Sequence, residues 1–195
     1  MGAVLIAACS AAPPRPASRS ASPSVSPSVS PSVSQVAAGT TGHGGPACHP
    51  SQLQLAAGPR ISEKTEQNTL LLVFRNVSAT TCDMRGYPVI ALTDSTGRRL
   101  SFAYRQGGDQ MLTSTPPGVV RLLPGGYAYS ALNKNSCVSF APTSAARAEV
   151  TPPGQDEPLV LTLAHYPILS YCRHSGHTID IAPLEPTIAD VLAQP

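Results

Sequence analysis

The sequence predicts an all-β fold, a sandwich or a barrel, that follows a low-complexity N-terminal segment. Short apolar runs alternate with turns rich in Gly and Pro, which is the pattern of a β-sandwich or barrel. No segment repeats its apolar side chains convincingly with the period of about 3.6 residues that a helix requires. Charged residues make up only 12% of the chain, whereas the outer faces of a helical bundle need many charges.

The predicted strands follow one another from residue 53 onward. Leu53 and Leu55 alternate with polar residues, as on a half-buried strand. Further strands are predicted at residues 69–74, 87–92, 100–104, 119–123, 127–132, 148–151, 159–163 and 178–181. Residues 94–97 form a turn, and residues 124–126 (Pro-Gly-Gly) are typical of a β-hairpin turn, because proline fixes φ and glycine accepts positive φ. Residues 186–195 contain one short helical turn or fray.

The N-terminus resembles the end of a bacterial lipoprotein signal peptide. Residues 6–9, Ile-Ala-Ala-Cys, match the lipobox, in which a branched apolar residue and two small residues precede a cysteine. The resemblance implies that Cys9 receives a diacylglyceryl group and becomes the mature N-terminus. No Lys or Arg precedes Cys9 and the apolar run is short, unlike a complete signal peptide. We therefore expect residues 1–9 to be a truncated signal that begins upstream; the alternative is a chance match in a cytosolic protein.

Residues 10–47 are predicted to be a disordered Ser/Pro-rich tether. Residues 22–33 repeat Ser-Pro-Ser-Val, and large apolar side chains are almost absent, so nothing offsets the entropy cost of ordering the segment. At ~3.1 Å per residue, an extended proline-rich chain of this kind reaches on the order of 100 Å. Its composition also suits an O-glycosylated stalk, with a plain linker as the alternative. With Cys9 lipidated, the domain is expected outside the cytoplasm, anchored to the outer face of the cell membrane.

The cysteines indicate an oxidising compartment. Cys9 lies apart from the other four, which are Cys48, Cys82, Cys137 and Cys172. Four cysteines in an exported domain predict disulfides, and three pairings are possible. Pairing between neighbours would close two loops of about 35 residues, and each loop would stabilise the fold by roughly 3–4 kcal/mol in the chain-entropy account.

An ordered set of short motifs resembles a known family. The set comprises residues 76–78 (Asn-Val-Ser), 81–88 (Thr-Cys-Asp-Met-Arg-Gly-Tyr-Pro), 123–128 (Leu-Pro-Gly-Gly-Tyr-Ala), Cys137 and 150–154 (Val-Thr-Pro-Pro-Gly). Together they resemble domain of unknown function 4232, found in secreted actinobacterial proteins and lipoproteins. The resemblance implies an immunoglobulin-like antiparallel β-sandwich at residues 48–185, a tail at 186–195, and the disulfides Cys48–Cys82 and Cys137–Cys172. It implies no activity, so no catalytic residue is carried over.

Several residues of these motifs suit a scaffold. Gly86 permits a backbone geometry that residues with a Cβ resist. Pro88 stiffens the start of a strand, and Asn76 is predicted to be a turn residue. The ring of Tyr87 is expected to be buried, with its hydroxyl hydrogen bonded.

The sharpest candidate for chemistry is the segment 172–177, Cys-Arg-His-Ser-Gly-His. Zinc and copper accept cysteine and histidine ligands, and His49 or His165 would be further candidates. A disulfide at Cys172 would remove its thiolate as a ligand. We therefore expect the histidines of this segment to lie in a surface loop, and we expect no metal.

No other pattern predicts catalysis. Ser175 lies between two histidines, but adjacency in sequence does not supply the geometry of a nucleophile, a base and an orienting group. The acidic residues are scattered, mostly next to turns (Asp83, Asp94, Asp109, Asp156), whereas a glycosidase needs paired carboxylates. A net charge of +2 and the absence of Trp argue against a nucleic-acid partner. We therefore expect a protein that is not an enzyme and has no cofactor.

The sequence thus predicts a cell-envelope lipoprotein that carries a non-catalytic binding module. Its partner would be an envelope protein, a glycan or a small ligand, and its oligomeric state is open. One alternative is a structural envelope protein without a specific ligand. A second is a metal-binding lipoprotein that uses the segment 172–177.

Overall fold

The computed structural model describes residues 44–61, 67–137, 143–163, 169–172 and 177–193. All of them belong to one compact unit, residues 41–195. The predictions for Cys9, for the tether up to residue 43, and for His165, His174 and Ser175 lie outside the described residues.

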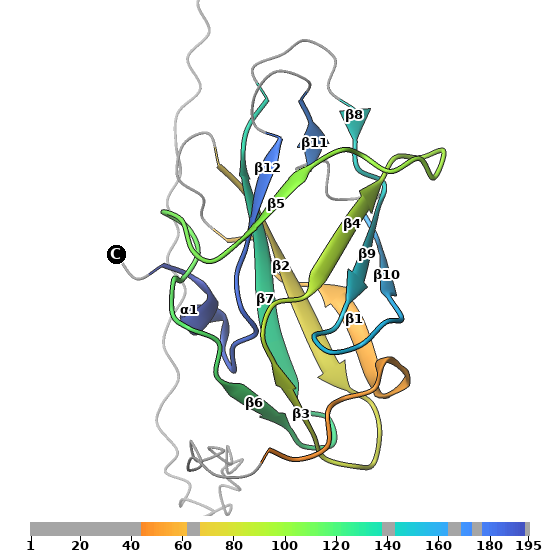
Figure 1. Cartoon of the computed structure of the whole chain (residues 1–195), viewed down its shortest axis with the longest axis vertical. Helices are drawn as coiled ribbons and strands as arrows, with labels where there is room; N and C mark the ends of the chain where they lie inside the picture. The colour runs from red at the N-terminus through yellow and green to blue at the C-terminus, as the bar shows by residue number, and fades with distance from the viewer. Residues whose placement is uncertain (1–43, 62–66, 138–142, 164–168, 173–176, 194–195) are drawn as a thin grey trace, which may run out of the picture. The chain divides into compact units, whose positions relative to one another are not determined.

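Two main β-sheets form the body of this unit (Figure 1). The larger has the strand order β1-β2-β7-β12-β5, with the bounds Leu53–Ala57, Gln67–Asn76, Tyr127–Asn135, Thr178–Ile181 and Ala103–Gln106. The smaller has the order β10-β9-β4, with the bounds Leu159–Thr162, Arg147–Thr151 and Val89–Thr93. The predicted all-β sandwich is confirmed.

Short elements complete the fold. They are the strand pair β3 (Cys82–Arg85) with β6 (Val119–Leu122), the pair β8 (Thr143–Ser144) with β11 (Ser170–Tyr171), the 3-10 turn η1 (Pro50–Gln52) and the helix α1 (Ile188–Val191). Among the named strands, every pairing is antiparallel except that of β12 with β5, which is parallel. Neither helical element of the described chain has the length and apolar character needed to cross a membrane.

The main core lies between the two sheets. Because side chains alternate along a strand, Leu70, Leu72 and Phe74 of β2 lie on one face, and all three are buried in one cluster. That cluster also contains Ile90, Leu92, Ala148 and Val150 of the smaller sheet and Leu132, Ile179 and Ile181 of the larger one. A continuous apolar run at residues 69–74 therefore indicates a central strand, as the sequence predicted.

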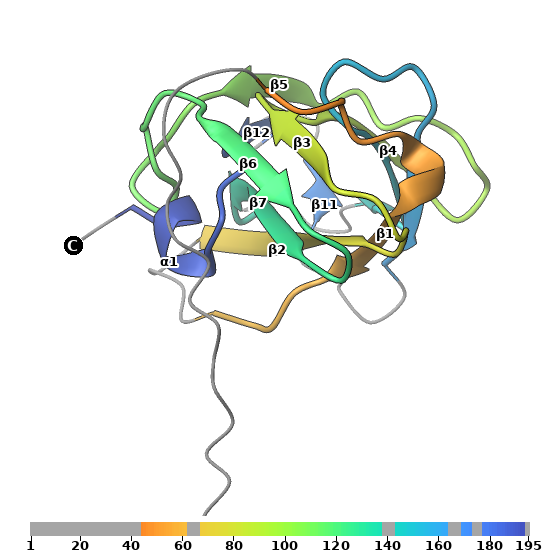
Figure 2. The ribbon, with the colours of Figure 1, turned by 90° about the horizontal axis from the view of Figure 1, so that it is seen from below.

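A second, smaller core covers the opposite face of the larger sheet. It consists of Leu71, Ala131 and Ala182 from the sheet, with Met111, Leu112 and Val191 packed over them. The helix α1 lies against β7 (Figure 2). Backbone hydrogen bonds of 2.8 Å from Thr113 N–H to the Val191 carbonyl and of 2.9 Å from Ala193 N–H to the Met111 carbonyl hold the C-terminal segment in place. The C-terminal residues therefore form the helical turn that was one of their two expected states.

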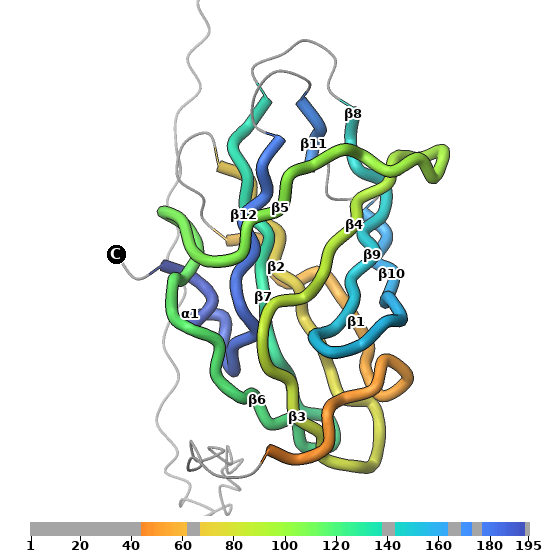
Figure 3. Tube along the Cα trace, in the orientation of Figure 1, coloured from red at the N-terminus to blue at the C-terminus, as the bar shows by residue number. Residues whose placement is uncertain are grey.

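The prediction of a hairpin at residues 124–126 was wrong. β6 pairs with β3, whereas β7 pairs with β2 and β12, so the turn carries the chain between two sheets (Figure 3). Gly126 N–H donates to the Leu123 carbonyl at 2.8 Å and Gly125 has φ +78°. Pro at the second position and a positive-φ Gly at the third are the signature of a type II turn. Such a turn splays the flanking strands, whereas the hairpin types I′ and II′ match their twist.

Candidate functional site

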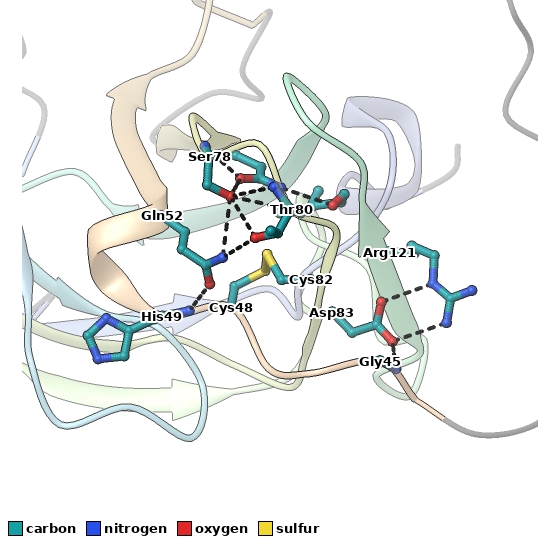
Figure 4. The surroundings of a disulfide bond; sticks show 11 residues. Gly45, Cys48, His49, Gln52, Ser78, Thr80, Cys82, Asp83 and Arg121 are labelled. Atoms are coloured by element: carbon teal, nitrogen blue, oxygen red, sulfur yellow. Dashed lines mark hydrogen bonds and ion pairs between the residues drawn. A yellow bond between two sulfur atoms is a disulfide. The ribbon is translucent and has the colours of Figure 1, made fainter.

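The Cys48–Cys82 disulfide fastens the chain where it enters the domain (Figure 4). The two Cα atoms are 4.8 Å apart, and both residues are buried. Beside the disulfide, Cys48 N–H donates to the Asp83 carbonyl at 3.0 Å, and Asp83 N–H donates to the Pro46 carbonyl at 2.8 Å. The disulfide and these bonds hold residues 46–48 against β3. This pairing confirms the one that the resemblance implied.

Asp83 is the polar centre of this junction (Figure 4). Arg121 donates from Nε to Oδ1 at 3.1 Å and from Nη2 to Oδ2 at 3.3 Å, and Gly45 N–H donates to Oδ2. The hydrogen bond from Arg121 lowers the pKa of the Asp83 carboxyl, although burial opposes that shift. The expectation that Asp83 lies next to a turn was wrong, because it lies within β3 directly opposite Arg121 of β6.

A group of polar side chains lies on the other side of the same disulfide (Figure 4). Gln52 donates from Nε2 to Thr80 Oγ1 at 2.9 Å and to Ser78 Oγ at 3.3 Å. His49 N–H donates to Gln52 Oε1 at 2.8 Å, and the His49 ring accepts from Ser51 N–H as the cap of η1. His49 therefore caps η1, and it belongs to no group of metal ligands among the described residues.

The Cys137–Cys172 disulfide closes the second predicted loop. Its Cα atoms are 5.6 Å apart, and Cys172 is buried whereas Cys137 is partly exposed. The side chain of Lys134 is 1% exposed, and its Nζ lies 3.9 Å from Cys172 Sγ and 4.0 Å from Cys137 Sγ. Burial lowers the pKa of Lys134. This pairing also confirms the one implied by the resemblance, whereas the buried lysine was not predictable from the sequence pattern.

Among the residues that the structure describes, no metal ligands come together at residue 172. Cys172 is oxidised, so it offers no thiolate, and His177 is exposed. In the part of the chain that the structure describes, no three His, Cys, Asp or Glu side chains form a group that could hold a metal ion.

A polar row crosses the outer face of the larger sheet, and the sequence pattern did not indicate it. Thr69, Asn133, Asp180 and Arg105 are register partners across β2, β7, β12 and β5. Thr69 Oγ1 donates to Asn133 Oδ1 at 2.8 Å, and Arg105 Nε donates to Asp180 Oδ1 at 2.5 Å. Burial raises the pKa of Asp180, which lies within hydrogen-bonding reach of the Asp109 carboxyl.

Asp109 ties a loop to this row. Its Oδ1 accepts from Met111 N–H at 2.7 Å and from Leu112 N–H at 2.9 Å, and its Oδ2 accepts from Asn133 Nδ2 at 2.5 Å. Asp109 therefore stabilises a turn, as expected from the sequence, and its oxygens are occupied by intramolecular donors. The row and its loop are a scaffold that spans four strands, because its members bond to one another.

A hollow of about 360 Å³ lies beside the turn at residues 94–97 and is lined by Asp94, Ser95, residues 143–146 and Leu163. Asp94 Oδ1 accepts from Thr96 Oγ1 at 2.6 Å, from Thr96 N–H at 2.9 Å and from Arg98 N–H at 3.0 Å. These bonds lower the pKa of Asp94 to about 2, and the bond from the Thr96 hydroxyl has the largest effect. The carboxylate thus fixes the predicted turn and is not free to bind a ligand in the hollow.

Three exposed apolar or aromatic side chains lie near the end of β2 and the start of β7, and Tyr129, which is half-buried against the second core, lies beside one of them. We call this group the tyrosine patch; it consists of Arg75, Val77, Leu123, Tyr127 and Tyr129. The exposed fractions are 53% for Val77, 43% for Leu123 and 46% for Tyr127. The rings of Tyr127 and Tyr129 are near-parallel, with centroids 6.4 Å apart, and Arg75 Cζ lies 5.9 Å from the Tyr127 centroid.

The backbone fixes the tyrosine patch in place. Gly125 N–H donates to the Asn76 carbonyl at 2.8 Å, and Asn76 N–H donates to the Gly126 carbonyl at 2.9 Å. The turn before β7 is thereby joined to the end of β2. The alternation of Tyr127 and Tyr129 could have pointed to one exposed face in the sequence. Val77 follows Asn76, which is bonded to the inter-sheet turn, and the sequence predicts a hairpin there instead.

Comparison with known proteins identifies the family. The family model described as Domain of unknown function (DUF4232) matches residues 48–185. No curated protein and no solved structure matches the chain. The match covers both disulfides and every strand of the two main sheets. The chain therefore belongs to the DUF4232 family.

Proposed function

We propose that the protein is a cell-envelope lipoprotein whose β-sandwich is a non-catalytic interaction module. The observation that carries the proposal is the tyrosine patch, which keeps large apolar and aromatic side chains in solvent. Adjacent exposed apolar side chains on a stable domain mark an interaction site more often than scattered ones do. The carboxylates of Asp83, Asp94 and Asp109 lie at separate places and are each engaged in intramolecular bonds, which favours a binding role over catalysis.

The partner favoured by this chemistry is another protein of the envelope. Tyrosine and arginine are enriched among the residues that dominate the affinity of protein interfaces, and Tyr127 and Arg75 lie together at the patch. Small-molecule sites are concave, whereas the patch lies on a strand end and a turn. A glycan or a small ligand is the less favoured occupant.

The attachment of the domain supports an extracytoplasmic location. Two disulfides suit an oxidising compartment, because thiols stay reduced in the cytosol. The Cys48–Cys82 junction secures the chain directly after the predicted tether, so tension on the tether would reach β3 through a covalent bond. Such a junction suits a domain that is held to a membrane through lipidated Cys9.

Binding by the tyrosine patch is tested with paired double variants of the full-length protein. The first double variant, Leu123→Ala with Tyr127→Ala, truncates the patch. The control, Val89→Ala with Val160→Ala, truncates two side chains of the smaller sheet that are likewise exposed, at 63% and 60%. Each immobilised protein is incubated with detergent-solubilised envelope, and the protein enriched on wild type is identified, purified and titrated. Loss of interface anchors of this kind weakens affinity by about tenfold or more.

The proposal predicts that only the Leu123/Tyr127 variant loses affinity. Equal binding by both double variants would show that the patch is not the contact surface. Enrichment of no protein, together with binding of purified wall glycan that depends on the same two residues, would replace the protein partner by a glycan. No partner of either kind would favour the structural role.

The lipid anchor has its own test. Cys9→Ala should move the protein from the membrane fraction to the soluble fraction of natively expressing cells, because one lipidated cysteine would be its attachment. Persistence of Cys9→Ala in the membrane fraction would contradict the anchor. The metal-binding alternative is not favoured, because Cys172 is disulfide bonded.

A further inference from the structure

Lys134 is a buried cation beside a disulfide. Its side chain is 1% exposed, although an ammonium group is costly to remove from water. Its Nζ donates to the backbone carbonyl of Asn135 and lies 3.9 Å from Cys172 Sγ. The ion pairs found among the described residues are formed by Arg98, Arg99, Arg105 and Arg121, and Lys134 takes part in none of them.

Reduction of the neighbouring disulfide would give this cation a counter-ion. A nearby ammonium group favours the thiolate form of a cysteine over the thiol. Cys172 is buried at the Lys134 ammonium, so its thiolate would form a charge pair that the oxidised protein lacks. The reduced state is therefore stabilised by an interaction that is absent from the oxidised state.

We propose that Cys137–Cys172 is a thiol–disulfide exchange site that accepts electrons from an external dithiol, with Lys134 stabilising the Cys172 thiolate that leaves. One thiolate of the dithiol attacks Cys137 Sγ, the Cys137–Cys172 bond breaks, and its electron pair departs on Cys172 Sγ. The second thiol of the dithiol loses its proton to solvent and attacks the mixed disulfide, and Cys137 is released and protonated. The dithiol becomes a disulfide, and the protein gains two electrons as one thiol and one thiolate.

The geometry gives this exchange a direction. Cys137 is partly exposed, so an external thiolate can reach it, whereas Cys172 is buried. The carbonyl oxygen of Ser170 lies 3.2 Å from Cys137 Sγ, where it can accept a hydrogen bond from the thiol that forms. A leaving sulfur with a lower pKa departs faster. Lys134 Nζ lies 3.9 Å from Cys172 Sγ and 4.0 Å from Cys137 Sγ, so the cation is close to both sulfurs. The exposure of Cys137 therefore favours attack there, with departure of Cys172.

The other disulfide of the chain is a built-in reference. The separations of 34 residues for Cys48–Cys82 and 35 residues for Cys137–Cys172 make the chain-entropy contributions nearly equal. Both cysteines of the first pair are buried, and the nearby guanidinium of Arg121 is already paired with Asp83. A difference in reducibility between the two bonds therefore reflects their surroundings rather than loop length.

The test equilibrates the natively oxidised full-length protein with mixtures of reduced and oxidised dithiothreitol. Free thiols are then trapped by alkylation, and each cysteine is quantified by peptide mass spectrometry. Because a cation commonly shifts a thiol by at least about one pKa unit, we expect Cys137–Cys172 to be about tenfold easier to reduce than Cys48–Cys82. Lys134→Met should make the Cys137–Cys172 disulfide about tenfold harder to reduce than in the wild type. Lys134→Arg, which keeps the charge, should leave it as easily reduced as in the wild type.

A second measurement does not depend on any variant. With limiting glutathione, the wild-type protein should form its mixed disulfide on Cys137 and not on Cys172. Glutathione on Cys172, or equal reduction of the two disulfides in the wild type, would overturn the proposal. Unchanged ease of reduction in Lys134→Met that retains an oxidised Cys48–Cys82 bond would overturn the role of Lys134.

Discussion

At the scale of single residues, Asn76 shows how one side chain can organise a turn from within the core. It is fully buried at the end of β2, and its Nδ2 donates to the carbonyls of Thr80 at 2.7 Å and Leu122 at 3.1 Å. Its Oδ1 accepts from Ser78 N–H at 3.0 Å and from Ser78 Oγ at 2.7 Å. The sequence predicted a turn residue, which is confirmed, but it did not indicate the burial or the bond to β6.

Asn76→Ala should destabilise the domain by about 2–4 kcal/mol, because two carbonyl oxygens near the core lose their donor and a cavity forms. Chemical denaturation measures the change in the free energy of unfolding. Ser78→Ala is the matched control, since its hydroxyl lies near the surface, and it should cost about 1 kcal/mol or less. Equal costs for the two variants would contradict the central role of Asn76.

Glu185 is a second residue whose environment the sequence did not reveal. It exchanges backbone hydrogen bonds with Tyr129, is 9% exposed, and its buried Oε1 has no hydrogen-bond partner among the described residues. Burial, followed by the negative charge of Asp190, raises the pKa of its carboxyl. The folded state thus favours the protonated form, so ionisation of Glu185 lowers stability.

Glu185→Gln should therefore stabilise the protein at neutral pH. In the wild type, the full stability is present below the unfolded pKa of 4.5 and declines as the pH rises through the raised folded pKa. Melting temperatures measured from pH 4 to pH 8 should show that the advantage of Glu185→Gln grows with pH. The exposed Glu157→Gln should change little across the range. An advantage of Glu185→Gln that is the same at every pH would refute this assignment.

At the scale of elements, most strands could be predicted from local signals, but β3, β8 and β11 could not. The apolar run that forms β2 and the alternation that forms β1 are strong local signals. β3 has four residues, two of them charged, and β8 and β11 have two residues each, so their pairing depends on neighbours that are distant in sequence. Local signals also placed the turn before β7, but not the sheet to which each flanking strand belongs.

The inter-sheet turn leads to a prediction about one glycine. Gly125 has φ +78°, and a Cβ added there would meet nothing within 4 Å, so Gly125→Ala tests backbone strain alone. The left-handed conformation costs a residue with a Cβ about 1–2 kcal/mol. Gly118 is equally open but has no positive φ, so Gly118→Ala should be neutral or slightly stabilising. A Gly125→Ala variant as stable as Gly118→Ala would contradict the turn geometry.

At the scale of the whole molecule, composition and spacing predicted an all-β sandwich or barrel, and the motif resemblance predicted the sandwich and both disulfide pairs. The polar row of Thr69, Asn133, Asp180 and Arg105 was not predictable, because it requires the register of four strands from distant parts of the chain. The tyrosine patch and the buried Lys134 depend on the same long-range pairing. Most of the scaffold could therefore be predicted from the sequence, whereas the candidate sites could not.

An exported, disulfide-bonded module requires that the four domain cysteines be paired and oxidised in the native cell. The most direct measurement is non-reducing peptide mapping with intact mass on protein purified from its native cells. The account predicts Cys48 linked to Cys82, Cys137 linked to Cys172, and Cys9 carrying a lipid at the mature N-terminus. Four free thiols on unlipidated protein would contradict an exported module, and would return the segment 172–177 to consideration as a ligand set.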